Sequence, residues 1–298
     1  MSPPATGGTG TRAGRLEVLD PGPLTTVQDL GRPGYARFGV GASGAADRSS
    51  LRLANRLVGN PEGAAGLEVT FGGLVLRVTR EAVVALTGAG AEPSVDGRAV
   101  GQHCSVRLRP GAVLRLGVPR SGVRTYLGVR GGIDVEPVLG SRSRDVLSGL
   151  GPPALTAGAW LPLGRPTQPL PGIDHAPVAG PPAGDLRLDI LVGPRDGWFA
   201  PGAVEVLTDV LWTVGQHSNR VGMRLLGPAL PHRGAGELPS EGVVRGALQV
   251  PAQGCPTLFL SDHPLTGGYP VIAVVVDAHV DRAAQARPGQ RLQFRPVV

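Results

Sequence analysis

Short runs of alternating apolar and polar residues, separated by glycine and proline, dominate the chain. Such runs are typical of half-buried β-strands joined by tight turns. In the first half they predict strands at residues 15–20, 66–78, 82–88, 105–118 and 123–132. In the second half they predict strands at residues 186–193, 224–230, 247–250, 256–262, 270–278 and 290–297. The pattern therefore predicts a mainly β fold.

One segment, residues 45–59, follows a helical period instead. Its apolar residues recur at i, i+3, i+6 and i+7, the spacing of one helix face. This stripe consists of Leu51, Ala54, Leu57 and Val58. Asp47 lies in the first turn, where a carboxylate interacts favourably with the helix dipole, and Gly59 is placed to end the helix.

The two halves are separated by a segment rich in proline and glycine, residues 151–185, which has no period. We interpret it as a linker or a long surface loop. An Arg-Pro-Gly tripeptide precedes an alternating strand in both halves, which suggests two related barrels in tandem. We therefore expect a disordered N-terminus at residues 1–14, a first barrel at residues 15–150 and a second barrel at residues 186–298.

Composition narrows the class of protein. The formal charge is +6 and all 29 cationic side chains are arginine, but they are scattered and not interleaved with aromatic residues, so we expect anion sites and no nucleic-acid groove. Two cysteines are too few for a disulfide framework or a cysteine-based zinc site. The start lacks an apolar signal region and no stretch is long enough to span a membrane, so we expect a cytoplasmic protein without membrane contact.

The run GVGASG, residues 39–44, spells the G-x-G-x-x-G pattern of dinucleotide-binding folds. That fold needs a strand directly before the first glycine and a parallel strand after the helix. Here a proline-glycine pair interrupts the upstream segment, and residues 66–78 predict a hairpin downstream. We therefore exclude this fold and expect the glycines to bring backbone amides to a helix N-terminus, where an anion could bind beside Ser43 and Asp47.

Three segments resemble the motifs of the biotin-dependent carboxyltransferase family, also called allophanate hydrolase subunit 2-like or KipA-type proteins. They are residues 25–60, 218–230 and 261–297. The resemblance extends from about residue 15 to the C-terminus. It implies two tandem cyclophilin-like β-barrels with a few short helices, which agrees with the pattern of strands.

The resemblance also implies a function. Free-standing bacterial members act as the C subunit of an ATP-dependent 5-oxoprolinase, which hydrolyses 5-oxoproline to glutamate together with the B and A subunits. ATP with Mg²⁺, shared with one of these partners, and no covalently bound cofactor are then expected. Two alternatives stay open: a carboxyltransferase like that of urea carboxylase, and a regulatory partner of a kinase-inhibitor protein. No segment resembles a biotinyl or biotin carboxylase domain, which favours the free-standing role.

Such a reaction makes definite demands on the site. The lactam amide is stable, and phosphorylation of its oxygen by ATP would open the carbon to attack by water. The site then needs cations for phosphate and carboxylate, a carboxylate for Mg²⁺ or for general-base work, and backbone amides for developing charge. The sequence has no G-x-x-x-x-G-K-[ST] motif, so any ATP site must be of another kind.

The first motif supplies one catalytic candidate, Asp29, and a guanidinium fork for carboxylate or phosphate, Arg32. The alternative is a turn in which Asp29 pairs with Arg32. Ser43 and Asp47 either cap the helix or face the ligand. The substrate- and phosphate-binding candidates of this motif are Thr26, Gln28, Arg32, Ser43, Gly44 and Asp47.

The second motif supplies a polar triplet, Ser218, Asn219 and Arg220, followed by Arg224. The triplet could simply form a turn. Alternatively, Arg220 or Arg224 at a barrel mouth would bind the substrate carboxylate or a phosphate. We then expect Arg220→Ala to abolish turnover while leaving the fold intact.

In the third motif, Asp262 and His263 directly follow Ser261, so these residues cannot form a hydrolase triad by spacing alone. His263 is the best general acid–base candidate by residue type, and loop hydrogen bonding is the alternative. Leu265 stands where the family often has threonine, which weakens any role for a hydroxyl there. The catalytic candidates are Asp262, His263 and Thr266, and the ligand-binding candidates are Gly267, Gly268 and Tyr269. No histidine spacing indicates a metal site.

Overall fold

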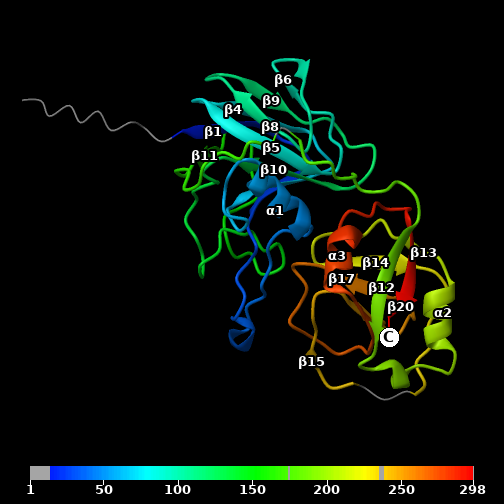
Figure 1. Cartoon of the computed structure of the whole chain (residues 1–298). Coiled ribbons are helices and arrows are strands. Elements are labelled where there is room, and N and C mark those ends of the chain that lie inside the picture. Colours follow the sequence, from blue (N-terminus) through cyan, green and yellow to red (C-terminus); the bar gives the residue numbers. More distant parts are fainter. Residues whose placement is uncertain (1–13, 174, 235–237, 298) are drawn as a thin grey trace, which may run out of the picture.

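The computed structural model describes residues 14–173, 175–234 and 238–297. Two β-rich halves follow one another along the chain, blue to green and then yellow to red in Figure 1. The described chain also contains three α-helices, so the predicted mainly β fold with a few short helices is confirmed. The expected disordered N-terminus lies outside the described residues except for Gly14. None of the helices in the described part has the length and apolar character needed to cross a bilayer.

Two antiparallel sheets form the first half. One has the strand order β11 (Trp160–Pro162), β1 (Arg15–Pro21), β4 (Leu74–Val78), β9 (Val113–Arg115), β6 (Ser94–Val95) and β7 (Arg98–Ala99). The other has the order β2 (Leu24–Gln28), β3 (Gly66–Thr70), β10 (Arg124–Val129), β5 (Ala82–Gly88) and β8 (Ser105–Leu108). Alternate side chains from both sheets share one apolar core that includes Val18, Leu67, Leu76, Leu86 and Leu127.

The predicted hairpin at residues 66–78 is wrong, because β3 and β4 belong to different sheets. The connection Phe71–Gly73 has positive φ at all three residues and carries the chain from one sheet to the other. A Cβ atom on Gly72 would lie 1.9 Å from the carbonyl oxygen of Gly117, so only glycine fits this corner. The exclusion of a dinucleotide-binding sheet still agrees with the structure, since every strand pair in the first half is antiparallel.

The segment interpreted as a linker or loop contributes a strand to the first half. Its residues 160–162 form β11, which pairs with β1, and Leu161 enters the core. Three residues are too few to show an alternating pattern against so many prolines and glycines. Composition alone therefore could not reveal this strand.

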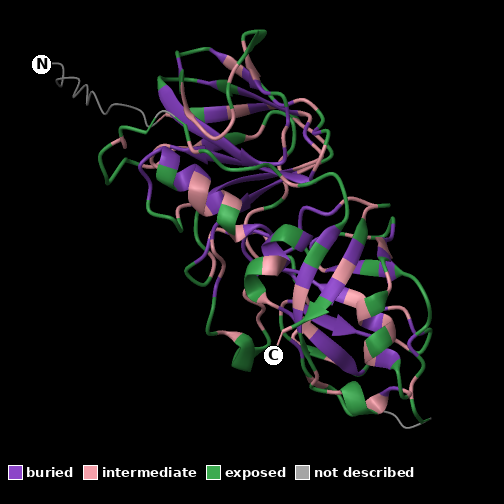
Figure 2. Cartoon of the chain, turned by 45° about the vertical axis from the view of Figure 1, so that its right-hand side comes forward, coloured by how far each residue is buried: buried purple, intermediate pink, exposed green. Residues whose placement is uncertain are grey.

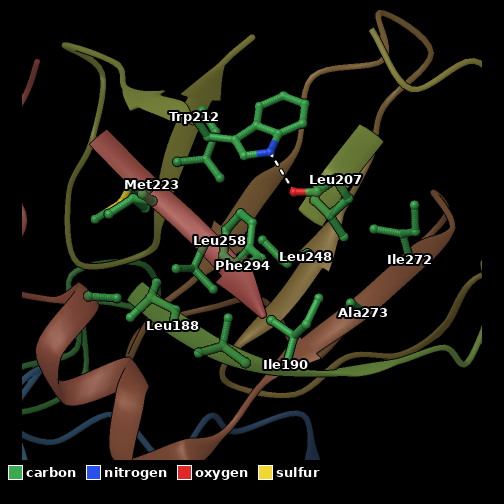
Figure 3. Close-up of a cluster of buried hydrophobic side chains, with 14 of the residues drawn as sticks. Leu188, Ile190, Leu207, Trp212, Met223, Leu248, Leu258, Ile272, Ala273 and Phe294 are labelled. Carbon is green, nitrogen blue, oxygen red and sulfur yellow. Dashed lines mark hydrogen bonds between the residues drawn. The ribbon is translucent and has the colours of Figure 1, made fainter. Parts of the chain in front are cut away.

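The second half is a closed barrel. Its strand order is β12 (Leu186–Val192), β19 (Val271–Val275), β16 (Ala247–Gln249), β17 (Thr257–Phe259), β14 (Gly222–Leu226), β13 (Trp212–Val214) and β20 (Arg291–Pro296). Neighbouring strands are antiparallel except β12 and β20, which are parallel and close the barrel. Figure 3 shows its core, in which the indole N–H of Trp212 donates to the carbonyl of Leu207 at 2.9 Å. A separate two-stranded ribbon consists of β15 (Glu241–Gly242) and β18 (Thr266–Gly267).

The helices are short and lie on the outside of the sheets. The predicted helix at residues 45–59 is α1 (Arg48–Leu57), which packs on β10 and β5, and its N-cap Asp47 accepts from the backbone N–H of Ser50. The other helices are α2 (Ala203–Asp209), α3 (Asp277–Ala283) and two 3-10 turns, η1 (Ala36–Phe38) and η2 (Asp196–Trp198). Figure 2 shows buried residues concentrated in the strands of both halves and exposed residues in the connecting loops.

Candidate functional site

A row of buried polar side chains crosses the five-stranded sheet on the face away from the core. Thr26 pairs with Glu68, Glu68 with Tyr126, and Tyr126 with Thr87, so these residues occupy one register position on four neighbouring strands. Their neighbours in sequence face the apolar core, which turns this row outward. Buried polar groups need hydrogen-bond partners, and the second half of the chain supplies one for Glu68, the guanidinium of Arg220.

Arg220 carries the main contact between the two halves. Its Nη1 donates to Glu68 Oε1 at 2.5 Å, and its Nη2 donates to the carbonyl of Gly44 at 2.6 Å. Its Nε and Nη2 donate to the two carboxylate oxygens of Asp262 at 2.8 and 3.0 Å. Asp262 lies beside Arg220 because its backbone N–H donates to the Arg220 carbonyl, next to the pairing of β14 with β17.

Glu68 is held as a carboxylate by its surroundings. Burial raises the pKa of Glu68, but the guanidinium groups of Arg220 and Arg124 outweigh burial and leave this pKa below its ordinary value. Its second oxygen accepts from the hydroxyl of Tyr126 at 2.6 Å and from the backbone N–H of Ala46 at 2.9 Å. Burial and the neighbouring Glu68 carboxylate together raise the pKa of Tyr126 well above its ordinary value, so the phenol remains a donor.

The hydrogen bonds of Arg220 leave its guanidinium little capacity for the predicted anion-binding role. All three of its guanidinium nitrogens donate to acceptors of the chain, and its side chain is 2% exposed. Ser43, a second predicted ligand residue, donates its hydroxyl to Asp262 Oδ1 at 2.7 Å. The structure thus brings Ser43, Gly44, Arg220 and Asp262 together, in contact with one another. This arrangement favours a role in joining the halves.

A second set of contacts joins α1 to α3. Asp281 accepts from Arg245 at 2.6 Å and from the backbone N–H of Ser49 at 2.9 Å. Gln285 donates to Asp47 Oδ2 at 2.8 Å. Burial raises the pKa of Asp47, and the hydrogen bonds from Gln285 and Ser50 partly offset this effect. The N-terminal end of α1 is therefore tied to the second half.

A cavity of about 570 Å³ lies between the halves, beside Arg220. Polar side chains line it from both sides: Gln216, Ser218, Asn219 and Arg220 from the second half, and Thr70 and Arg124 from the first. The remaining lining is apolar and consists of Leu24, Phe71, Val123, Val146, Met223, Leu260, Ala286 and Pro288. A mostly apolar cavity with a few convergent polar groups is typical of a small-molecule site. We call it the junction cavity.

Asn219 is placed to contact a ligand in the junction cavity. Its Oδ1 accepts from the backbone N–H groups of Val221 and Gly222 at 2.8 and 3.2 Å. These bonds orient the amide so that the Nδ2 donor is the group left for a ligand. Asn219 also lines a neighbouring cavity of about 510 Å³ on the outer face of the barrel, where the predicted ligand residue Arg224 lies with His217 and Phe259.

The predicted residues of the first motif hold a loop in place. Asp29 accepts from Ser141 Oγ at 2.7 Å and from the backbone N–H of Arg142 at 2.6 Å. Arg32 donates to backbone carbonyls of the same loop, so the alternative pairing of Asp29 with Arg32 is not formed among the described residues. The other two candidates meet here as well: Gln28 donates to Thr26 Oγ1 at 3.0 Å and to the carbonyl of Arg144 at 2.8 Å.

His263 has the protonation pattern of a base. Its Nδ1 lies 2.7 Å from the carbonyl of Pro264, which can only accept, so Nδ1 carries the proton and Nε2 keeps a lone pair. Burial lowers the pKa of His263 and outweighs the hydrogen bond to Pro264, which raises it. Its ring packs 6.2 Å from that of Phe259, yet His263 lines neither cavity described above.

The rest of the third motif lies elsewhere. Thr266 and Gly267 form β18 in the two-stranded ribbon, and Gln249 donates to the carbonyl of Tyr269 at 3.1 Å. Neither these residues nor Gly268 lines the junction cavity. The motif therefore divides: Asp262 belongs to the junction, whereas the ligand-binding candidates Gly267, Gly268 and Tyr269 lie outside the junction cavity.

Most of the first half's contribution to this junction lies outside the three motifs. The residues not predicted in the first half are Glu68, Arg124 and Tyr126. Those not predicted in the second half are Arg245, Asp281 and Gln285. One signal was available: Glu68 stands inside the apolar run GLEVT, and a carboxylate buried in a strand must be paired. Within the described ranges, no group of three or more His, Cys, Asp or Glu side chains is placed to hold a metal ion.

Known proteins resemble this chain over nearly its full length. The family described as carboxyltransferase domain, subdomain A and B, matches residues 38–296. The C subunit of the 5-oxoprolinase of Escherichia coli K12 is 37% identical over 285 residues, which cover 94% of this chain and 90% of that protein. The urea amidolyase of Lachancea kluyveri is 36% identical over 309 residues, but the match covers 17% of that much longer protein.

Solved structures also resemble this chain over nearly its full length. The crystal structure of TTHA0988 superposes with a TM-score of 0.87 at 38% identity and covers 95% of this chain, which spans about half (56%) of the TTHA0988 chain. The urea carboxylase of Kluyveromyces lactis superposes with a TM-score of 0.88 at 32% identity, over 96% of this chain and 28% of that one. The family predicted from the three motifs is confirmed, and the chain belongs to the carboxyltransferase domain family, subdomains A and B.

Proposed function

We propose that this chain is the C subunit of an ATP-dependent 5-oxoprolinase, and that the B and A subunits complete the enzyme. One observation carries this proposal: the C subunit of the E. coli enzyme is similar over 94% of this chain and 90% of its own length. The similarity thus extends through nearly the whole relative. The match to the Lachancea urea amidolyase covers only 17% of that enzyme.

The proposed reaction opens an unstrained five-membered lactam. One ATP and two water molecules are consumed, and glutamate, ADP and inorganic phosphate are released. The C–N bond of the lactam breaks, its nitrogen becomes the amine, and its carbonyl carbon becomes a carboxylate. Transfer of the phosphoryl group to the lactam oxygen makes that carbon electrophilic, because phosphate is a far better leaving group than oxide.

The junction cavity is where we place 5-oxoproline. Its apolar lining, which includes Phe71 and Met223, suits the CH₂ groups of the ring. The Nδ2 donor of Asn219 would bind the lactam oxygen, and Arg124 on the opposite side would attract the substrate carboxylate. Arg124 lies 3.4 Å from Glu68 and retains a buried Nε without a hydrogen-bond partner.

Among the residues that the structure describes, the carboxylates next to the junction cavity do not fit a complete magnesium site. The two carboxylates next to the cavity, Glu68 and Asp262, are already bound by Arg220. Magnesium prefers free carboxylate and phosphate oxygens. We therefore propose that ATP with Mg²⁺ is held chiefly by a partner protein of the complex, which presents the phosphoryl group to the junction cavity.

A second candidate function has support of its own. The family bears the name carboxyltransferase, and the Kluyveromyces urea carboxylase superposes with a TM-score of 0.88. The junction cavity could instead receive a carboxylated biotin from a carrier on another chain. The carboxyl group would then pass to a small amide acceptor, with biotin taking back the proton that the amide nitrogen releases.

Reconstitution separates the two candidates. The chain is co-expressed with the A and B subunits encoded in its own genome, and the formation of glutamate and ADP from 5-oxoproline and ATP is measured. We expect activity only with all three proteins, at least tenfold lower for Asn219→Ala and unchanged for Arg98→Ala, an exposed arginine on β7. An assembled complex that forms no glutamate overturns the proposal, and transfer from carboxybiotin by that complex would establish the second function.

A further inference from the structure

Another cavity lies at the far end of the five-stranded sheet. It has a volume of about 430 Å³, and three arginines, Arg80, Arg107 and Arg130, line it. Strand β5 begins at this cavity with Ala82 and ends at Gly88, beside Gln285 of the junction. The arginine cavity, as we call it, is therefore separated from the junction cavity by the length of a strand.

The register of the sheet gathers two of these arginines on one face. Arg107 of β8 pairs with Val83 of β5, and the backbone N–H of Arg130 donates to the carbonyl of Val83 at 2.8 Å. Arg107 on β8, Val83 on β5 and Arg130 just after the end of β10 thus form one row. Strands in a sheet lie about 4.8 Å apart, so the two arginine stems start about 10 Å from each other. Like charges in such a row repel.

Little negative charge offsets these cations. Glu81 is the one acidic residue in the described lining, and it lies 3.5 Å from Arg107 with both side chains about two-thirds exposed (67% and 69%). An exposed pair at this distance contributes little because water and salt screen it. Arg130 donates to the carbonyls of Val58 and Gln168 at 2.9 and 2.8 Å, which position its charge without neutralising it.

The backbone is shaped to hold Arg130 in this position. Gly59 has a φ of +66°, and a Cβ atom there would lie 2.7 Å from Arg130 Nη1 and 2.4 Å from the carbonyl oxygen of Pro169. Only glycine leaves room for the guanidinium between these groups. A cation fixed in advance loses little rotamer entropy when an anion binds.

We propose that the arginine cavity binds a small phosphorylated anion. Guanidinium groups form paired hydrogen bonds to phosphate oxygens, and such bonds are stronger than those between neutral groups. The bound anion would also remove the mutual repulsion of the three arginines. This site is independent of the lactam reaction proposed for the junction cavity, and its ligand is either free phosphate or the phosphate of a nucleotide.

Calorimetric titration of the purified chain tests the proposal, with inorganic phosphate, pyrophosphate and AMP as probes. We expect saturable binding that weakens at least tenfold in Arg80→Glu and as salt is raised, because charge dominates the contact. Arg98→Glu is the matched control: Arg98 is an exposed arginine that does not line the cavity, and its variant should bind as the wild type does.

The arms of this experiment also identify the ligand. Tighter binding of AMP than of phosphate would indicate a nucleotide, and equal binding would indicate the phosphate group alone. Absence of saturable binding for all three probes overturns the proposal. An equal loss in Arg80→Glu and Arg98→Glu also overturns it, because binding would then follow net charge and not this cavity. Thermal unfolding of both variants shows that the fold is retained.

Discussion

Glu68 and Arg220 are 152 positions apart in the sequence, yet their side chains meet at 2.5 Å between Oε1 and Nη1. Asp262 binds the other edge of the same guanidinium. The first half contributes one carboxylate to this cluster, and the second half contributes the arginine and the other carboxylate. Arg220 also lines the junction cavity, whose polar lining comes from both halves, so this cavity is complete only when the two halves are docked.

Replacing Arg220 with methionine should destabilise the whole protein. The substitution leaves the Glu68 and Asp262 carboxylates buried without their cation, and breaking such a cluster costs about 3–5 kcal/mol. Urea unfolding of Arg220→Met measures the loss. This expectation differs from the prediction made from the sequence alone, in which loss of the Arg220 side chain spares the fold.

Arg224→Met is the control for that experiment. Arg224 is an exposed arginine on the same segment, and its replacement should change the free energy of unfolding by no more than about 0.5 kcal/mol. If Arg220→Met unfolds at the wild-type urea concentration, the cluster does not hold the halves together. Arg220 would then be available for the anion-binding role.

The stability of the protein should fall in acid through Glu68. Its pKa in the folded state lies below the ordinary value of 4.5, so the folded protein binds fewer protons than the unfolded chain. The stabilisation is complete above about pH 4.5 and is lost as the pH falls through the lower folded pKa. Urea unfolding between about pH 7 and pH 3 should show this loss.

Glu68→Gln isolates the contribution of this carboxylate. The variant should be less stable near neutral pH, because Arg220 loses one of its charged partners, and its stability should depend less on pH in acid. Glu136→Gln, at an exposed position, should keep the wild-type slope. An unchanged slope in Glu68→Gln would show that other carboxylates cause the acid sensitivity.

The strong periodic signals in the sequence predicted structure well. The run of residues 82–88 became β5, and the apolar stripe of residues 45–59 became α1. Short elements were missed, because α2 and α3 have seven residues each and β11 has three, which is too little for a period to emerge. The predicted hairpin failed because its turn lies at the edge between two sheets, which only the tertiary structure defines.

The candidate site was predictable only in part. The motifs correctly pointed to residues that meet in space, since Ser43 and Asp262 are hydrogen-bonded across 219 positions. The sequence could not show that the motifs bind one another, because Glu68, the first-half carboxylate that binds Arg220, lies outside the motifs. Residue type also favoured His263 as a base, and its hydrogen bond to Pro264 was invisible without coordinates.

His263 should be neutral near pH 7, with the proton on Nδ1. Burial lowers its pKa below the ordinary value of 6.5, so in acid the unfolded chain protonates this histidine before the folded protein does. The free energy of unfolding should therefore be highest above about pH 6.5 and should fall as the pH drops to the lower folded pKa. Nitrogen-15 NMR of the imidazole reports both the tautomer and the pKa. A proton on Nε2, or a pKa above 6.5, would contradict the geometry, and His263→Gln identifies the signal.

A side chain at Gly227 should destabilise the protein, because Gly227 lies against the indole of Trp212 in the barrel. A Cβ atom at Gly227 would be 2.6 Å from Trp212 Cε3, and the ring cannot withdraw while its N–H is bound to Leu207. Gly227→Ala should therefore cost about 1–3 kcal/mol in the free energy of unfolding. At Gly197 nothing lies within 4 Å of the added atom, so Gly197→Ala should change stability by about 0.5 kcal/mol or less. Equal urea midpoints for the two variants would mean that the indole has room to move.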